Sequence, residues 1–199
     1  MSVSSCLRSP VLGLALSAIA LPLLAQDLPN LREARRLTFA PNGAVEVEYI
    51  PNDAVSANDA ALLQMDLFQQ QIGASVPYYG AVAMAPGMGL QSEATVAGAN
   101  FHDVEHARAF ALAGCEDLRR GDGPECVVVM VIRPQGWESG RALQLSAQAT
   151  AALRGEYRSM GRPRAMAISD ATGHWGVGTS EAAAVSDCGE SDCRAVVID

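Results

Sequence analysis

Two stretches of the chain share one order of features, in which an alanine-rich segment ends at a cysteine and a second cysteine opens a β-branched run. The first is RAFALAGCEDLRRGDGPECVVVMVI, with Cys115 and Cys126, and the second is EAAAVSDCGESDCRAVVID, with Cys188 and Cys193. Upstream, YYGAVAMAP and EATVAGAN correspond to PRAMAISD and HWGVGTS. Each half therefore predicts a strand, a turn, a strand, a helix, a loop and a strand, and together they predict an internal repeat.

The recurrence of the cysteine pair at the same joint favours two local disulfides, Cys115–Cys126 and Cys188–Cys193. A disulfide tolerates the different lengths of the two loops, because it requires only that the helix end lie near the start of the next strand. Crossed disulfides are one alternative. A metal site or free thiols are another, although both pairs lack the CxxC spacing that is typical of zinc sites and redox pairs.

Residues 1–25 have the features of a secretory signal peptide: one arginine, an apolar run too short to span a bilayer, and a small residue where polarity returns. We expect cleavage after Ala25, with Ala20 as the competing site. Cleavage removes Cys6 and leaves four cysteines, an even number that suits an exported protein with disulfides. No cysteine follows the apolar run directly, so we expect no lipid anchor and a mature protein that is periplasmic or secreted.

The charge balance argues against two classes of partner. The chain has a formal net charge of −8, and an acidic protein is not attracted to the phosphates of nucleic acids or of anionic lipids. We therefore expect no nucleic-acid binding and no stable membrane anchor. We expect no cofactor either, and the partner that suits such a chain is another envelope or secreted protein.

The predicted fold class is α+β. Two ββαβ halves are expected to form a mainly antiparallel sheet with helices packed on one side, within a domain that spans residues 77–199. Residues 26–76 are expected to add a hairpin, RRLTFAPNGAVEVEYIP with PNG as its turn, and an amphipathic helix, SANDAALLQMDLFQQQIG. The segment between the halves offers a further helix at about residues 145–160.

The half-motifs GAVAMAP…ARAFALAGC…CVVVMVI and AMAIS…GVGTSEAAAVSDC…CRAVVID resemble a family of small exported bacterial domains of unknown function. The resemblance covers about residues 79–199, and the segment between the halves is longer than the family's pattern implies. It implies the fold and the compartment, and it carries over no catalytic residue. Such proteins sometimes bear the label aminolevulinate synthase, but that enzyme holds pyridoxal phosphate through a lysine, and this chain has no lysine.

The sequence HDVEH places His102 and His106 four residues apart, on one face of a helix. With His174 they form a candidate metal site, because imidazole nitrogens are common metal ligands. The other interpretation is structural: Asp103 suits the N-cap of a helix, and the histidines then lie in its first turn.

Two further groups are candidate binding residues. Trp137 and Trp175 lie in glycine-containing turns, where an exposed aromatic ring would mark a binding surface. Arg154 and Arg158 share a helix face and begin a local basic run that would suit an anion or an acidic partner. The alternatives are that the tryptophans cover the core and that the arginines form a solvated helix face.

Three functions are consistent with these features. The leading hypothesis is a non-catalytic envelope or secreted interaction module, which predicts no convergent polar pocket. The second is a small periplasmic hydrolase or metal-dependent enzyme that uses His102, His106 and His174, which requires His174 to lie within reach of HDVEH. The third is an inhibitor or immunity-type protein, which requires a protruding loop such as the segment around Trp137.

Overall fold

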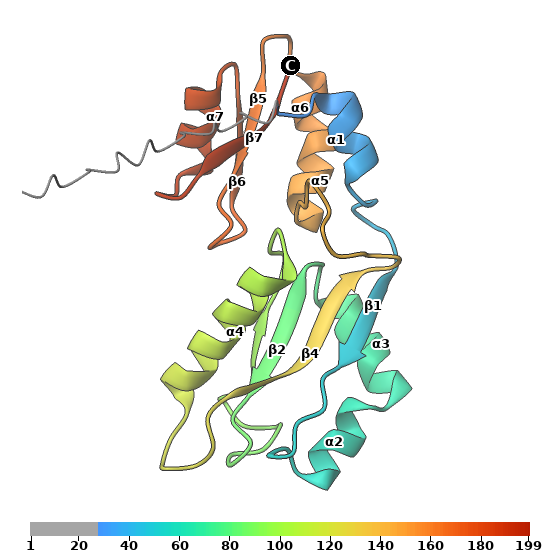
Figure 1. Cartoon of the computed structure of the whole chain (residues 1–199), viewed down its shortest axis with the longest axis vertical. Coiled ribbons are helices and arrows are strands. Elements are labelled where there is room, and N and C mark those ends of the chain that lie inside the picture. Colours follow the sequence, from blue (N-terminus) through green and yellow to red (C-terminus); the bar gives the residue numbers. More distant parts are fainter. Residues whose placement is uncertain (1–27) are drawn as a thin grey trace, which may run out of the picture.

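The computed structural model describes residues 28–199, which form two lobes stacked along the long axis of the molecule (Figure 1). We name residues 45–134 the first lobe, and residues 28–37 together with 147–199 the second lobe. From residue 28 the chain runs through the second lobe, crosses to the first, and returns through residues 135–146. The predicted signal peptide and its cleavage site lie outside the described residues.

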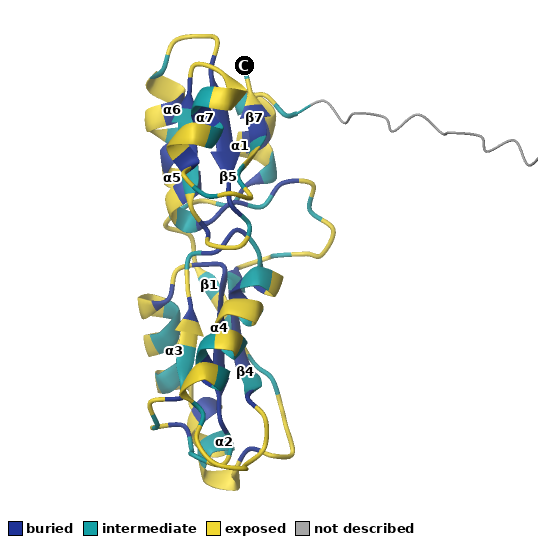
Figure 2. Cartoon of the chain, turned by 90° about the vertical axis from the view of Figure 1, so that its left-hand side faces the viewer, coloured by how far each residue is buried: buried dark blue, intermediate teal, exposed yellow. Residues whose placement is uncertain are grey.

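The first lobe is built on a four-stranded antiparallel sheet in the order β1-β4-β2-β3. Its strands are β1 (Val45–Tyr49), β2 (Gly80–Met84), β3 (Val96–Gly98) and β4 (Val127–Pro134), and its helices are α2 (Ala57–Leu63), α3 (Asp66–Ser75) and α4 (Val104–Leu118). Every residue of the inner strand β2 is buried, because neighbouring strands flank it and helices cover both faces of the sheet (Figure 2).

Alternation along β2 accounts for the two helix layers. Ala81 and Ala83 pack with Ala107 of α4, and these small side chains let the helix lie close to the sheet. Val82 and Met84 point to the opposite face, where they pack in a cluster with residues of α2 and α3. The lobe therefore has three layers, helix, sheet and helix.

The second lobe is built on a three-stranded antiparallel sheet in the order β6-β5-β7. Its strands are β5 (Ala165–Ile168), β6 (Trp175–Gly178) and β7 (Arg194–Ile198), and its helices are α1 (Leu31–Leu37), α5 (Ala147–Arg154), α6 (Glu156–Ser159) and α7 (Glu181–Cys188). Ala165 and Ala167 pack with α7, whereas Met166 and Ile168 pack with α1, α5 and α6. A Cβ atom at Gly178 would overlap the backbone of α7, so this close approach requires glycine.

The two lobes place the same order of elements around a central strand: two helices, two strands, a helix and a strand. The register of each sheet shifts midway along that strand, after Val82 in the first lobe and after Met166 in the second. The segment between the halves, which is longer than the family resemblance implies, contains α5 and α6, and these occupy the place that α2 and α3 have in the first lobe. The internal repeat of the sequence stays a prediction.

The disulfide pairing that the sequence favours is confirmed. Cys115–Cys126 joins the last turn of α4 to the residue before β4, and Cys188–Cys193 joins the end of α7 to the residue before β7. The Cα atoms of the two pairs lie 6.1 and 6.2 Å apart, within the usual range for a disulfide. Each lobe therefore closes its own helix–strand loop covalently.

The α+β class is confirmed, but the finer arrangement differs from the prediction. The two halves form separate sheets rather than one, and helices cover both faces rather than one side. The predicted hairpin is wrong, because Leu31–Leu37 is a helix and β1 pairs with β4. Residues 28–76 are shared between the lobes and form no separate unit, and the expected 145–160 helix is interrupted at Gly155.

Candidate binding cleft between the lobes

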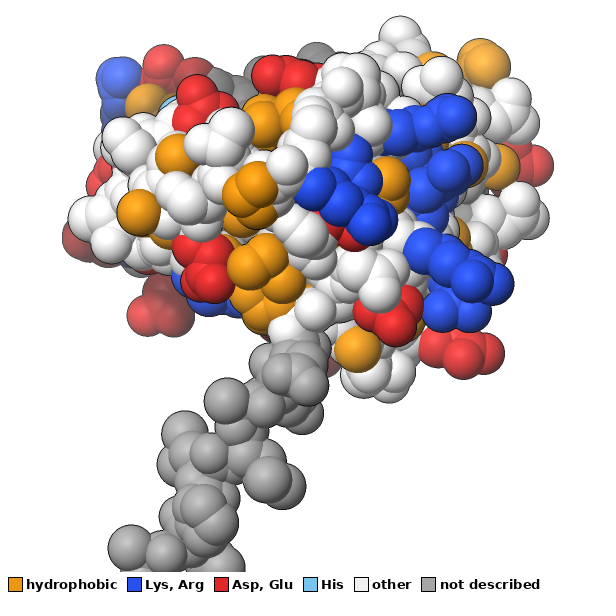
Figure 3. Space-filling model, turned by 90° about the horizontal axis from the view of Figure 1, so that it is seen from above, with side chains coloured by type: hydrophobic (Ala, Val, Ile, Leu, Met, Phe, Trp, Pro, Cys, Tyr) orange, Lys and Arg blue, Asp and Glu red, His pale blue; other side chains and the backbone are white. Residues whose placement is uncertain are grey.

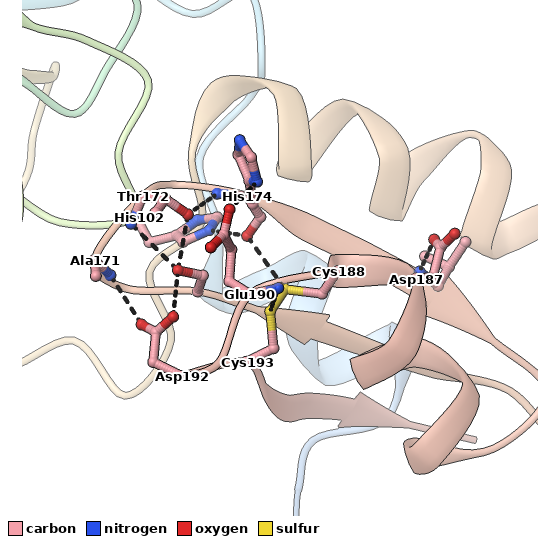
Figure 4. The surroundings of a disulfide bond; sticks show 11 residues. His102, Ala171, Thr172, His174, Asp187, Cys188, Glu190, Asp192 and Cys193 are labelled. Atoms are coloured by element: carbon pink, nitrogen blue, oxygen red, sulfur yellow. Dashed lines mark hydrogen bonds and ion pairs between the residues drawn. A yellow bond between two sulfur atoms is a disulfide. The ribbon is translucent and has the colours of Figure 1, made fainter.

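The turn between β5 and β6 presents the main-chain carbonyl of His174 to the first lobe. Asp192 holds this turn, because its carboxylate accepts hydrogen bonds from Ser169 Oγ (2.7 Å) and from the Ala171 N–H (3.1 Å) (Figure 4). These two hydrogen bonds lower the pKa of Asp192. The Cys188–Cys193 disulfide closes the loop that carries Asp192, so the disulfide, the loop and the turn support one another.

His102 contacts this turn from the first lobe. It is 1% exposed, and its Nδ1 atom accepts a hydrogen bond from the Ser146 N–H (3.0 Å). Because a main-chain N–H can only donate, the ring proton lies on Nε2, which donates to the His174 carbonyl oxygen (2.9 Å). Ser146 is the N-cap of α5. One imidazole therefore connects the start of α4, the β5–β6 turn and the start of α5.

Burial lowers the pKa of His102. The hydrogen bond to the His174 carbonyl and the carboxylates of Asp170 and Asp103 act in the opposite direction, but burial is the larger effect. The ring is therefore neutral at pH 7, in agreement with the one donor and one acceptor that its hydrogen bonds require. A second ring proton would place an N–H against the Ser146 N–H.

Other contacts between the lobes also involve the main chain. The Ala147 N–H donates to the Tyr78 carbonyl (3.1 Å), and the Gln148 N–H donates to Asn100 Oδ1 (3.1 Å). Gly173 has a φ of +76° and lies so close to Asn100 that a Cβ atom would come within 2.6 Å of the Asn100 carbonyl oxygen. The close approach of the two lobes at this point therefore requires glycine at position 173.

A cleft of about 880 Å³ opens beside this joint. Its apolar residues come from the second lobe and the returning segment, and they include Leu143, Ile168 and Val196. His102 and Asp103 complete it from the first lobe. Clefts of this size between two structural units are common ligand sites in proteins.

Helix α1 forms one wall of the cleft and is fixed at both ends. Asn30 and Glu33 form a capping box, in which each side chain accepts a hydrogen bond from the other residue's main-chain N–H (3.1 and 3.0 Å). At the other end, one Arg154 nitrogen lies 3.2–3.3 Å from three carbonyl oxygens, those of Arg35, Thr38 and Phe39. The wall is therefore preorganised for binding.

The rim of the cleft carries charges of both signs. Six charged side chains line it: Glu33, Arg36, Asp103, Arg141, Asp170 and Arg194. Two of the acids already have partners, because Asp170 pairs with Arg194 (2.8 Å) and Asp103 pairs with His106 (2.7 Å). The Arg141 guanidinium stacks on the Phe39 ring, 4.2 Å from its centre. An apolar floor with a mixed-charge rim suits a ligand that is itself amphipathic.

The structure brings the three histidines near one another but gives each ring a different partner. His106 Nδ1 pairs with Asp103, the N-cap of α4, as the structural interpretation requires. His174 Nδ1 pairs with Glu190 (2.9 Å), and only its carbonyl contacts His102. Within residues 28–199, no group of three or more His, Cys, Asp or Glu side chains is placed to hold a metal ion.

The predicted surface residues are mostly used internally. The Trp137 indole N–H donates to Gln144 Oε1 (2.8 Å) and the ring packs beside a buried cluster, while Trp175 is half-buried against the core of the second lobe. Arg154 holds the end of α1, as described above. Arg158 is exposed. The segment around Trp137 is therefore not simply a protruding aromatic loop.

Apart from His102 and Asp103, sequence reasoning missed the residues that line the cleft. Arg36, Arg141 and Arg194 come from three distant segments, and no periodicity or spacing links them. The capping box at Asn30 and Glu33 was the one available signal, because it indicates a helix start. Even so, the capping box does not predict that this helix packs against the second lobe, because the chain passes through the first lobe before it returns to the second.

Comparison with known proteins adds no relative: no protein-family model, curated protein or solved structure matches the chain. In the described part of the chain, no helix is long and apolar enough to cross a membrane.

Proposed function

We propose that the protein is an exported, non-catalytic interaction module, and that it binds an extended segment of another envelope or secreted protein in the cleft between its lobes. The observation that carries this proposal is the cleft itself, in which a buried apolar floor lies under a rim of both charge signs. The compartment rests on the predicted signal peptide and on the resemblance to the exported family.

The edge of the second sheet supports a peptide ligand. β7 lies at the edge of its sheet, and two of its residues, Arg194 and Val196, line the cleft. Among residues 28–199 its outer edge makes one main-chain hydrogen bond, from the Ile198 N–H to the Pro29 carbonyl (3.1 Å). An extended peptide recognises such an edge by adding a strand, while its side chains enter the neighbouring pockets.

The side chains of the candidate catalytic residues also favour binding over catalysis. Both ring nitrogens of His102 are engaged by main-chain groups, and the four cysteines of the described chain are in disulfides. A general base or nucleophile needs a free, correctly protonated atom at the reacting centre. These groups instead hold the lobes and loops in place.

A peptide selection tests the proposal. Random peptides displayed on phage are selected against the wild-type protein, and the enriched peptides are titrated into Ala142→Arg and Ala182→Arg. Both alanines are exposed, but Ala142 lines the cleft whereas Ala182 lies on α7. We expect Ala142→Arg to weaken binding by about tenfold or more and Ala182→Arg to change it by less than about twofold. Failure to enrich any peptide, or equal binding to both variants, contradicts the proposal.

A further inference from the structure

The charge of the chain is divided unequally between the lobes. The first lobe has twelve Asp and Glu against four Arg, a net charge of −8, whereas the second lobe has eight of each and is neutral. The acidic character of the whole chain therefore belongs to the first lobe. This permits a basic site on the second lobe that the overall composition conceals.

Five of the arginines of the second lobe line one groove of about 460 Å³ along α1: Arg32, Arg35, Arg36, Arg154 and Arg162. The first three are spaced i, i+3 and i+4 along α1, so they share a face of that helix. Viewed from the end of the second lobe, arginine side chains gather on one side of the surface (Figure 3). Asn30 and Leu31 complete the lining, which contains no carboxylate.

Four of the five guanidinium groups of the groove are largely available to a ligand, whereas that of Arg154 is engaged by the carbonyls at the end of α1. Arg32, Arg35 and Arg36 are exposed, and none has an ion-pair partner among residues 28–199. Arg162 is 71% exposed and shares the buried Asp199 with Arg164, which takes up that carboxylate's second oxygen (2.9 Å). The positive charge of the groove is therefore only slightly neutralised by the protein itself.

We infer that this groove binds a ligand with clustered phosphate groups. Guanidinium groups match phosphate oxygens in a bidentate geometry, and a phosphate monoester carries nearly two negative charges at neutral pH. An acidic peptide carries at most one carboxylate per residue, so it cannot bring as much charge into so small a groove. The volume suits a small phosphorylated molecule or a short run of phosphates.

This inference goes beyond the proposed function, because the groove and the cleft are lined by different, adjoining faces of α1. Arg36 lines both, whereas Arg32 and Arg35 line the groove alone. Substitution of Arg32 and Arg35 therefore tests the groove without altering the lining of the cleft. Arg120 offers a matched control, because it is an exposed arginine of the first lobe, with 76% of its side chain exposed.

The test is calorimetric titration of the full mature chain with sodium tripolyphosphate. We expect binding that weakens as salt is added, a loss of affinity of about tenfold or more in Arg32→Gln/Arg35→Gln, and a change below about twofold in Arg120→Gln. Thermal unfolding of each variant confirms that it is folded. The absence of tripolyphosphate binding, or equal affinity in the two variants, overturns the inference.

A second ligand distinguishes the source of the phosphate, and a third tests the preference for phosphate over carboxylate. Vesicles of phosphatidylcholine with about 20 mol% phosphatidic acid present phosphate at a lipid surface. Binding that needs Arg32 and Arg35 supports a lipid headgroup as the source, and binding of tripolyphosphate alone supports a soluble phosphorylated molecule. Hexaglutamate that binds as tightly as tripolyphosphate contradicts the preference for phosphate.

Discussion

The substitution His102→Ala probes the joint between the lobes. It removes a ring that is 1% exposed, and it deprives the buried Ser146 N–H of the acceptor at 3.0 Å. The unsatisfied N–H costs about 1–3 kcal/mol, and the lost packing of the ring costs about 2 kcal/mol more. Loss of the hydrogen bond from His102 to the His174 carbonyl costs little, because this carbonyl keeps its hydrogen bond from the Ser169 N–H (2.9 Å). We expect a total loss of about 3–5 kcal/mol in the free energy of unfolding.

Urea unfolding followed by circular dichroism measures this loss. His106→Ala is the matched control, because its ring is 43% exposed and its pair with Asp103 is a surface interaction. Its loss should remain below about 1 kcal/mol. If His102→Ala lies within about 1 kcal/mol of wild type, or equals His106→Ala, the buried imidazole does not hold the lobes together and our reasoning about the joint is wrong.

Three other predictions follow from the same contacts. Because burial lowers the pKa of His102 in the folded protein, the unfolded chain takes up a proton at a higher pH than the folded chain does. The free energy of unfolding should therefore fall as the pH drops below about 6.5, by at most about 1.4 kcal/mol per pH unit. Urea titrations of His102→Gln should lack this pH-dependent loss of stability. Replacing both cysteines of Cys115–Cys126 by alanine should lower the free energy of unfolding by about 3 kcal/mol, and the same change at Cys188–Cys193 should lower it by about 2 kcal/mol. The first loss is larger because that disulfide spans 11 residues and the second spans 5. A larger loss for Cys188–Cys193 in chemical denaturation contradicts this prediction. Intact mass spectrometry of protein expressed with its leader should show cleavage after Ala25 in the extracellular or periplasmic fraction. A full-length mass in that fraction contradicts cleavage, and retention of the protein in the cytoplasm contradicts export.

Local chemistry was predictable from the sequence where neighbouring residues decide it. The disulfides follow from a helix end and a strand start that are adjacent in the chain, and Asp103 is an N-cap because its side chain needs only the next turn of backbone. The predicted hairpin failed because it rested on the PNG turn signal and did not use the spacing of Asn30 and Glu33, which form a capping box at the start of α1.

The long-range arrangement was not accessible in the same way. The alternation along β2 and β5 indicates two buried faces only after both strands are known to lie inside a sheet. The packing of α1 against the second lobe depends on contacts between residues more than a hundred positions apart, such as the hydrogen bond from Arg154 to the Arg35 carbonyl. The cleft and the arginine groove both depend on the packing of α1 against the second lobe. In the sequence, Arg32, Arg35 and Arg36 therefore show only a helical spacing.

The most direct test of the proposed function is to map a selected peptide on the protein by nuclear magnetic resonance. Backbone amide shifts are recorded for the uniformly labelled mature chain with and without the peptide. The account predicts shifts concentrated at Leu143, Ile168 and Val196, with His102 affected from the other lobe. Shifts confined to α2, α3 or α7, with the cleft residues unchanged, would show that the protein binds its partners elsewhere.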